Sequence, residues 1–151
     1  TVSEHRNTLI QNDFAPFKAL ADLPMAMTAH IIFAAYDAVN PATQSAEMLR
    51  VIREVIGFGG LLMTDDLNMQ ALQGDLASRT ARSIAAGCDI ALHCKGDLAQ
   101  MQQVAAAAGA MTPAAQSRAH AALAQRRAPK TVDIAGLEAM LSEIEHKGSH
   151  G

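Results

Sequence analysis

Short apolar segments alternate with helical segments through most of the chain, and this alternation limits the fold more than any other feature of the sequence. The apolar segments are Met25–Ile32, Leu61–Thr64 and Asp89–His93, and residues with helical spacing separate and follow them. Apolar runs of this kind are typical of strands covered on both faces. Strands that alternate with helices predict a parallel sheet joined by right-handed crossovers. We therefore expect an α/β fold with about three neighbouring parallel strands and flanking helices.

Residues that commonly start and end helices support this expectation. Ser3–Ala21 has helical spacing, with a kink or an end of the regular helix expected at Pro16. Gly57 marks the expected end of the helix that precedes the second strand. Helix starts are predicted at four sites with capping residues: Ser45, Asp75, Asp97 and the pair Thr112–Pro113, whose helix is expected to reach about Arg127.

The end of the chain is predicted to form a separate element. A last amphipathic helix has apolar residues spaced three and four apart, at Ile134, Leu137, Leu141 and Ile144. The tail from Lys147 to Gly151 is expected to be disordered. We therefore divide the chain into residues 1–128, which contain the strands, and residues 129–151, which contain the terminal helix and tail.

The second strand ends in three polar residues, Thr64, Asp65 and Asp66. Parallel strands deliver side chains to a site at their carboxyl ends, where barrels and open α/β sheets carry out their chemistry. Two carboxylates there are costly unless water, a partner or a substrate uses them. They are candidates for catalysis, but Asp66 also suits a cap for the following turn, with Asp65 simply solvated. The spacing alone leaves both interpretations open.

Sequence motifs around this strand resemble those of the bacterial β-N-acetylglucosaminidases of glycoside hydrolase family 3. The most specific is Asp-Asp-Leu-Asn-Met at residues 65–69, preceded by Gly-Phe-x-Gly. The resemblance spans roughly residues 7–127 and implies the C-terminal part of a TIM-type (β/α)8 barrel, with the three strands as the sixth to eighth. The other matching segments are Asp13–Phe17, Pro24–His30, Pro41–Thr43, Leu49–Phe58 and Ala86–Asp89.

The resemblance also implies an activity, that of a retaining exo-β-N-acetylglucosaminidase acting on peptidoglycan fragments. Asp65 corresponds to the nucleophile, and Asp66 to a position that the family does not hold fixed. Thr64 is placed to donate a hydrogen bond near the nucleophile. His30 is a candidate for substrate binding or for support of the nucleophile, although a buried histidine satisfied by backbone is an equal alternative. Met69 is a candidate apolar wall against the sugar, or else a core contact.

Two segments that the family carries are missing from these 151 residues. They are Lys-His-Phe-Pro-Gly-His-Gly and the Asp-Ser-His triplet that supplies its acid/base. We therefore expect the chain to be the C-terminal part of a longer enzyme, inactive alone, and to self-associate or to pair with the missing half. Two alternatives stay open: a truncated, non-catalytic homologue that binds a partner, and an unrelated aldolase-like enzyme, for which Lys95 is the candidate lysine.

Composition excludes several other functions. Aromatic residues make up 3% of the chain and the net charge is −3, which disfavours a nucleic-acid partner. No apolar run reaches the ~20 residues of a membrane span. Cys88 and Cys94 lack metal-binding spacing, so we expect no metal, and the resemblance implies no cofactor and a cytoplasmic location. Five arginines are interpreted as solvating helix surfaces: Arg79, Arg82, Arg118, Arg126 and Arg127.

Overall fold

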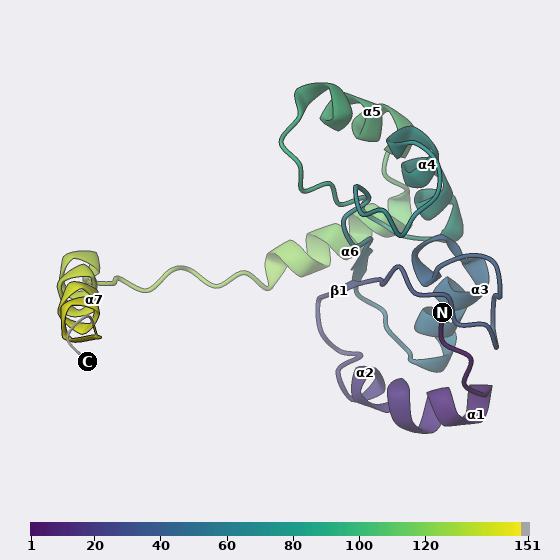
Figure 1. The fold of residues 1–151 in the computed structure, drawn as a ribbon, viewed down its shortest axis with the longest axis horizontal. Coiled ribbons are helices and arrows are strands. Elements are labelled where there is room, and N and C mark those ends of the chain that lie inside the picture. The colour runs from purple at the N-terminus through teal and green to yellow at the C-terminus, as the bar shows by residue number, and fades with distance from the viewer. Residues whose placement is uncertain (149–151) are drawn as a thin grey trace.

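The computed structural model describes residues 1–148 as two short parallel strands with helices packed around them (Figure 1). Strand β1 (Met25–Met27) pairs with strand β2 (Leu61–Met63), with Met25 opposite Leu61 and Met27 opposite Met63. The helix α3 (Ala46–Arg50) and the π-helical segment η3 (Val51–Val55) connect the two strands. The predicted α/β class with parallel strands is therefore confirmed.

The strands are fewer and shorter than the sequence predicts. The expected strand 25–32 ends at Met27, and the following segment turns to pair with the chain start, where Val2 N–H donates to Ile32 O at 2.7 Å. The expected third strand is reduced to a single bridge between Met63 and Ile90. At Leu62 the Asp89 carboxylate takes the place of a backbone carbonyl as the acceptor of the N–H hydrogen bond. A regular ladder therefore does not extend across segment 89–93.

The first predicted helix is broken into three pieces. These are α1 (Arg6–Thr8), the π-helical segment η1 (Leu9–Asp13) and α2 (Ala15–Ala19). Pro16 lies in the first turn of α2, where its missing N–H costs no hydrogen bond. The break predicted at Pro16 is therefore present, but at Phe14, two residues before the proline.

The predicted helix starts are confirmed by their caps. The Ser45 hydroxyl accepts from Met48 N–H at the start of α3, and Gly57 follows η3 with a φ of 83°. Carboxylates cap α4 (Leu76–Ala86) at Asp75 and α5 (Leu98–Ala108) at Asp97. Thr112 caps α6 (Pro113–Ala124), which ends before the predicted Arg127.

Two apolar clusters hold the body together. The larger lies beneath the strands and is formed by side chains from the N-terminal helices, α3, η3 and β2. The smaller lies where α4 and α5 pack together and contains four buried residues: Leu67, Leu72, Leu76 and Val104. Leu67 is fully buried there, two residues after Asp65, so the second cluster fixes the loop that follows β2.

The last helix stands apart from the body. An extended segment separates α7 (Ile134–Gly148) from α6, as Figure 1 shows at its yellow end. Ile134, Leu137, Leu141 and Ile144, the residues of the predicted amphipathic stripe, are all exposed. Lys147 and Gly148, expected to begin a disordered tail, complete α7, while residues 149–151 lie outside the described part. Within residues 1–148, no helix is both long and apolar enough to cross a membrane.

Candidate functional site

The loop after β2 carries the two candidate aspartates. Thr64, at its start, is completely buried, and its hydroxyl accepts a hydrogen bond from Leu92 N–H at 2.8 Å. This contact ties the end of β2 to segment 89–93. The Thr64 hydroxyl oxygen therefore links β2 to segment 89–93, whereas the sequence predicted a hydrogen bond near the nucleophile.

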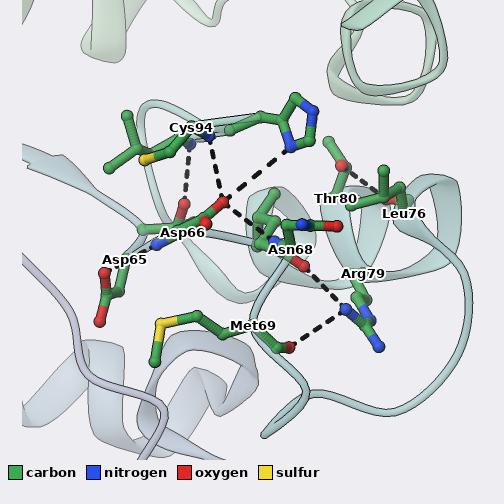
Figure 2. A network of polar contacts seen from close by, with 12 residues as sticks. Asp65, Asp66, Asn68, Met69, Leu76, Arg79, Thr80 and Cys94 are labelled. Atoms are coloured by element: carbon green, nitrogen blue, oxygen red, sulfur yellow. Dashed lines mark hydrogen bonds and ion pairs between the residues drawn. The ribbon is translucent and has the colours of Figure 1, made fainter. Parts of the chain in front are cut away.

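Asp65 and Asp66 point in opposite directions (Figure 2). One oxygen of Asp65, Oδ1, accepts from Asp66 N–H at 2.8 Å, and the carboxylate extends away from segment 93–94. The Asp66 Oδ1 atom turns toward that segment and accepts from Asn68 N–H at 3.0 Å and Cys94 N–H at 3.2 Å. The Asn68 contact is the turn cap foreseen for Asp66. The two adjacent carboxylates therefore occupy different chemical environments.

His30 joins the loop after β1 to the loop after β2. Its Nε2 atom lies 3.0 Å from Asp66 O, and its Nδ1 atom lies 2.8 Å from the Thr43 hydroxyl. A carbonyl can only accept, so the hydrogen-bond network places the proton on Nε2 and lets Thr43 donate to Nδ1. Both ring nitrogens are thus occupied. A sugar contact by His30 stays a prediction, and it would have to replace one of these bonds.

Met69 is 44% exposed, so it is not the core contact that the sequence left open as an alternative. In Figure 2 its side chain extends to the same side of the loop as Asp65. Its backbone is held by Arg79, whose Nη1 atom donates to Leu67 O at 2.9 Å and to Met69 O at 3.1 Å. A role of Met69 in substrate binding stays a prediction.

Arg79 and Arg118 do more than solvate helix surfaces, so that interpretation is wrong for both. Arg79 fixes the loop carbonyls from the first turn of α4. The sequence could have indicated this contact. An arginine in the first turn of a helix is within reach of the loop that precedes the helix. Arg118 of α6 instead binds Asp89, at 2.7 Å from its Oδ1 atom. That contact lies far along the chain and has no local signal.

A second polar cluster lies where segment 89–93 begins. The Asp89 carboxylate, 5% exposed, binds Arg53 and Arg118 at 2.7 Å each. Burial lowers the pKa of the Arg53 guanidinium, and the Asp89 charge opposes that shift. A cleft of about 890 Å³ lies beside these three residues, but neither Asp65 nor Met69 lines it.

The remaining candidates for metal or nucleophilic chemistry find no support in the geometry. In the described part of the chain, no three His, Cys, Asp or Glu side chains gather to hold a metal ion. Burial raises the pKa of the Cys88 thiol to about 12, which opposes thiolate formation. Lys95 is exposed, whereas an aldolase lysine needs burial or nearby charge to lower its pKa.

Comparison with known proteins points to one family. The sequence model described as the glycosyl hydrolase family 3 N terminal domain matches residues 1–127. A beta-hexosaminidase of Bordetella pertussis is 35% identical over 95 residues, which cover 60% of this chain and 27% of that protein. The chain therefore spans about a quarter of the length of this relative.

Solved structures agree on the fold. A family 3 beta-N-acetylglucosaminidase from Paenibacillus has a TM-score of 0.72 and 22% identity, and covers 88% of this chain and 29% of its own. NagZ from Neisseria gonorrhoeae, solved in complex with N-trifluoroacetyl-D-glucosamine, has a TM-score of 0.64 and 26% identity. That match covers 80% of this chain and 36% of the Neisseria chain.

Proposed function

The chain belongs to glycosyl hydrolase family 3, and from this premise we propose that the protein containing it is a retaining exo-β-N-acetylglucosaminidase. The 35% identity to a beta-hexosaminidase supports this activity over others in the family. The family match also removes the aldolase-like alternative, which depended on a chance motif. Residues 1–127 are then the C-terminal part of a (β/α)8 barrel, with β1, β2 and segment 89–93 in the sixth to eighth strand positions.

The observation that carries the proposal is the opposite orientation of the two aspartates. Within residues 1–148, Asp65 accepts one hydrogen bond, at Oδ1, and Oδ2 is left for a reacting carbon. Asp66 Oδ1 is occupied by two backbone N–H groups. A nucleophile needs an ionised carboxylate with a free oxygen, and a hydrogen bond to the charged form favours ionisation. Asp65 offers a free oxygen, Oδ2, and its Oδ1 atom accepts one backbone hydrogen bond.

The mechanism follows from these positions. Asp65 Oδ2 attacks the anomeric carbon, the bond from that carbon to the leaving oxygen breaks, and a glycosyl-enzyme ester forms. A general acid protonates the leaving oxygen and then, as a base, activates the water that hydrolyses the ester. We place that acid/base group in a part of the protein outside these residues. In this mechanism Met69 supplies an apolar contact to the sugar. His30 lies at the edge of the same site, at the carboxyl ends of the strands.

The proposed substrate is a peptidoglycan fragment that carries a terminal N-acetylglucosamine, which the enzyme releases in the cytoplasm. The sugar analogue bound in the Neisseria structure supports the sugar part of this proposal. Hydrolysis of purified peptidoglycan fragments by the full-length gene product, followed by mass spectrometry, tests the substrate. Release of another monosaccharide in place of N-acetylglucosamine would contradict it, and fractionation of cells tests the location.

The nucleophile is tested by trapping. The full-length gene product is incubated with a 2-fluoro sugar that slows hydrolysis of the glycosyl-enzyme, and the labelled peptide is sequenced by mass spectrometry. We expect the label on Asp65, and Asp65→Ala should lower kcat by about 10⁴-fold or more because the covalent route is lost. Asp66→Ala should still be labelled at Asp65. A label on Asp66 would reverse the assignment.

The 151-residue chain alone is expected not to turn over. General-acid help is typically worth about 10²–10⁴-fold, and the contacts that orient the sugar add more. An aryl N-acetylglucosaminide with an activated leaving group depends less on general-acid catalysis. It is therefore the most sensitive substrate for testing the purified chain. Turnover near the rate of the full-length protein, abolished by Asp65→Ala, would place the acid/base within these residues.

A further inference from the structure

Asp66 connects three segments of the chain through its own polar groups. Its N–H donates to Asp65, its carbonyl accepts from His30, and its carboxylate accepts from Asn68 and Cys94. His30 belongs to the segment after β1. Cys94, labelled in Figure 2, follows segment 89–93. The carboxyl ends of β1, β2 and segment 89–93 therefore meet at this one residue, next to Asp65.

We propose that Asp66 is a positioning residue, which fixes the direction of the Asp65 carboxylate for attack. This proposal rests on the function proposed above. With its carbonyl and its carboxylate both anchored, the φ and ψ angles of Asp66 are confined. Its N–H is then held toward Asp65 Oδ1 at 2.8 Å, which leaves Asp65 few alternative rotamers. The catalytic oxygen is pre-positioned by a neighbour that does not touch the substrate.

A buried histidine beside the Asp66 carboxylate supports the same role. The His93 side chain is 5% exposed, and both ring nitrogens are buried without a hydrogen-bond partner within residues 1–148. Its Nδ1 atom lies 3.9 Å from Asp66 Oδ1, the nearest carboxylate recorded for it. A buried polar ring carries a cost unless it finds a partner, so a small rotation toward Asp66 is favoured. Such a rotation would add His93 to the two backbone N–H groups that already hold the Asp66 carboxylate.

The same geometry excludes His93 as the acid/base of the reaction. Both ring nitrogens are buried within residues 1–148, and the Asp66 carboxylate, 3.9 Å from Nδ1, points away from Asp65 (Figure 2). A general acid must reach the leaving oxygen on the substrate side of the nucleophile. The Asp66–His93 pair therefore acts on the reaction only through the placement of Asp65.

The proposal makes a specific kinetic prediction. A displacement of a reacting group by about 1 Å can lower a rate by about 100-fold without removing the group. In the full-length gene product, Asp66→Ala should lower kcat on an aryl N-acetylglucosaminide by about 10- to 100-fold, with KM changed by less than about threefold. Asp66→Asn should recover kcat to within about fivefold, because its amide oxygen accepts the same two backbone N–H groups.

A matched control separates positioning from stability. The exposed Asp75 carboxylate also accepts a backbone hydrogen bond, from Ser78 at 2.8 Å, but it caps α4 and does not contact the Asp65 loop. Asp75→Ala should lower the melting temperature by an amount similar to Asp66→Ala and leave kcat unchanged. If Asp66→Ala does not fold, Asp66→Ser takes its place, because a hydroxyl reaches Asn68 N–H but not Cys94 N–H.

Three outcomes distinguish this inference from the proposed function. Wild-type kcat in the folded Asp66→Ala or Asp66→Ser variant would overturn the inference, as would Asp66→Asn being as impaired as Asp66→Ala. A wild-type protein that does not hydrolyse the aryl substrate would overturn the proposed function. In that case hydrogen exchange at Cys94 N–H decides the inference, because loss of the Asp66 carboxylate should accelerate it at least about tenfold.

Discussion

At the scale of single residues, the two cysteines occupy opposite environments. Cys88 is buried in the main cluster, where its thiol lies 3.7 Å from Thr43 O, and burial raises its pKa to about 12. Cys94 is exposed at the end of segment 89–93. A thiolate is the reactive form, and a raised pKa reduces its share at any pH below that value.

Reaction with iodoacetamide at pH 8 should therefore discriminate between them. In the folded chain we expect Cys94 to be alkylated at least about 100-fold faster than Cys88, because Cys88 is both shielded and protonated. In 8 M urea the two rates should become similar, which serves as the control. Mass spectrometry of the two peptides over time measures both rates, and equal rates in the folded chain would contradict the burial of Cys88.

At the scale of elements, the start of β2 lies tightly against the chain before β1. A Cβ atom added at Gly60 would lie 2.7 Å from both Leu23 O and Pro24 O, which are backbone atoms and cannot move aside cheaply. A Cβ atom added at Gly59 would meet nothing within 4 Å. The pairing of β1 with β2 therefore requires glycine at position 60 but not at position 59.

This pair of neighbouring glycines gives a matched stability test. Gly60→Ala should lower the free energy of unfolding by about 2 kcal/mol or more, because it forces the two strands apart. Gly59→Ala should change it by less than about 0.5 kcal/mol. Urea unfolding followed by circular dichroism measures both. Similar losses in the two variants would show that this close approach is absent.

At the scale of the whole molecule, apolar surface remains uncovered beside β1. Met27 is 51% exposed and Phe17 of α2 is 63% exposed, with Leu20, Leu23 and Met25 exposed near them in sequence. Within residues 1–148, β1 is paired on one edge only. Exposed edges and apolar patches favour pairing with another chain.

We therefore expect the chain alone to self-associate, or to bind the rest of the barrel proposed above. Light scattering at about 10–100 μM should show species larger than a monomer, and Met25→Glu with Met27→Glu should reduce them by charging the strand edge. Met140→Glu on α7 is the control, because Met140 is also exposed but lies on the separate helix. A monomer throughout would contradict this prediction, and loss of association only with Met140→Glu would assign the contact to α7.

The sequence by itself determined the elements whose signals are local. The caps at Ser45, Asp75 and Thr112 were predictable because each closes a hydrogen bond to a backbone N–H three residues away. The position of β2 followed from an apolar run that ends in carboxylates, and the family resemblance singled out Asp65 as the candidate nucleophile. These features need no knowledge of which segments meet in space.

Only the tertiary structure decided which contacts the two aspartates make. The bond from His30 to Asp66 joins residues 36 positions apart, and the bond from Cys94 to Asp66 joins residues 28 positions apart. Such contacts depend on the register between β1, β2 and segment 89–93, which no local pattern specifies. After Met27 the chain turns to pair with Val2, and in the third strand the Asp89 carboxylate takes a ladder position, so that only one bridge remains.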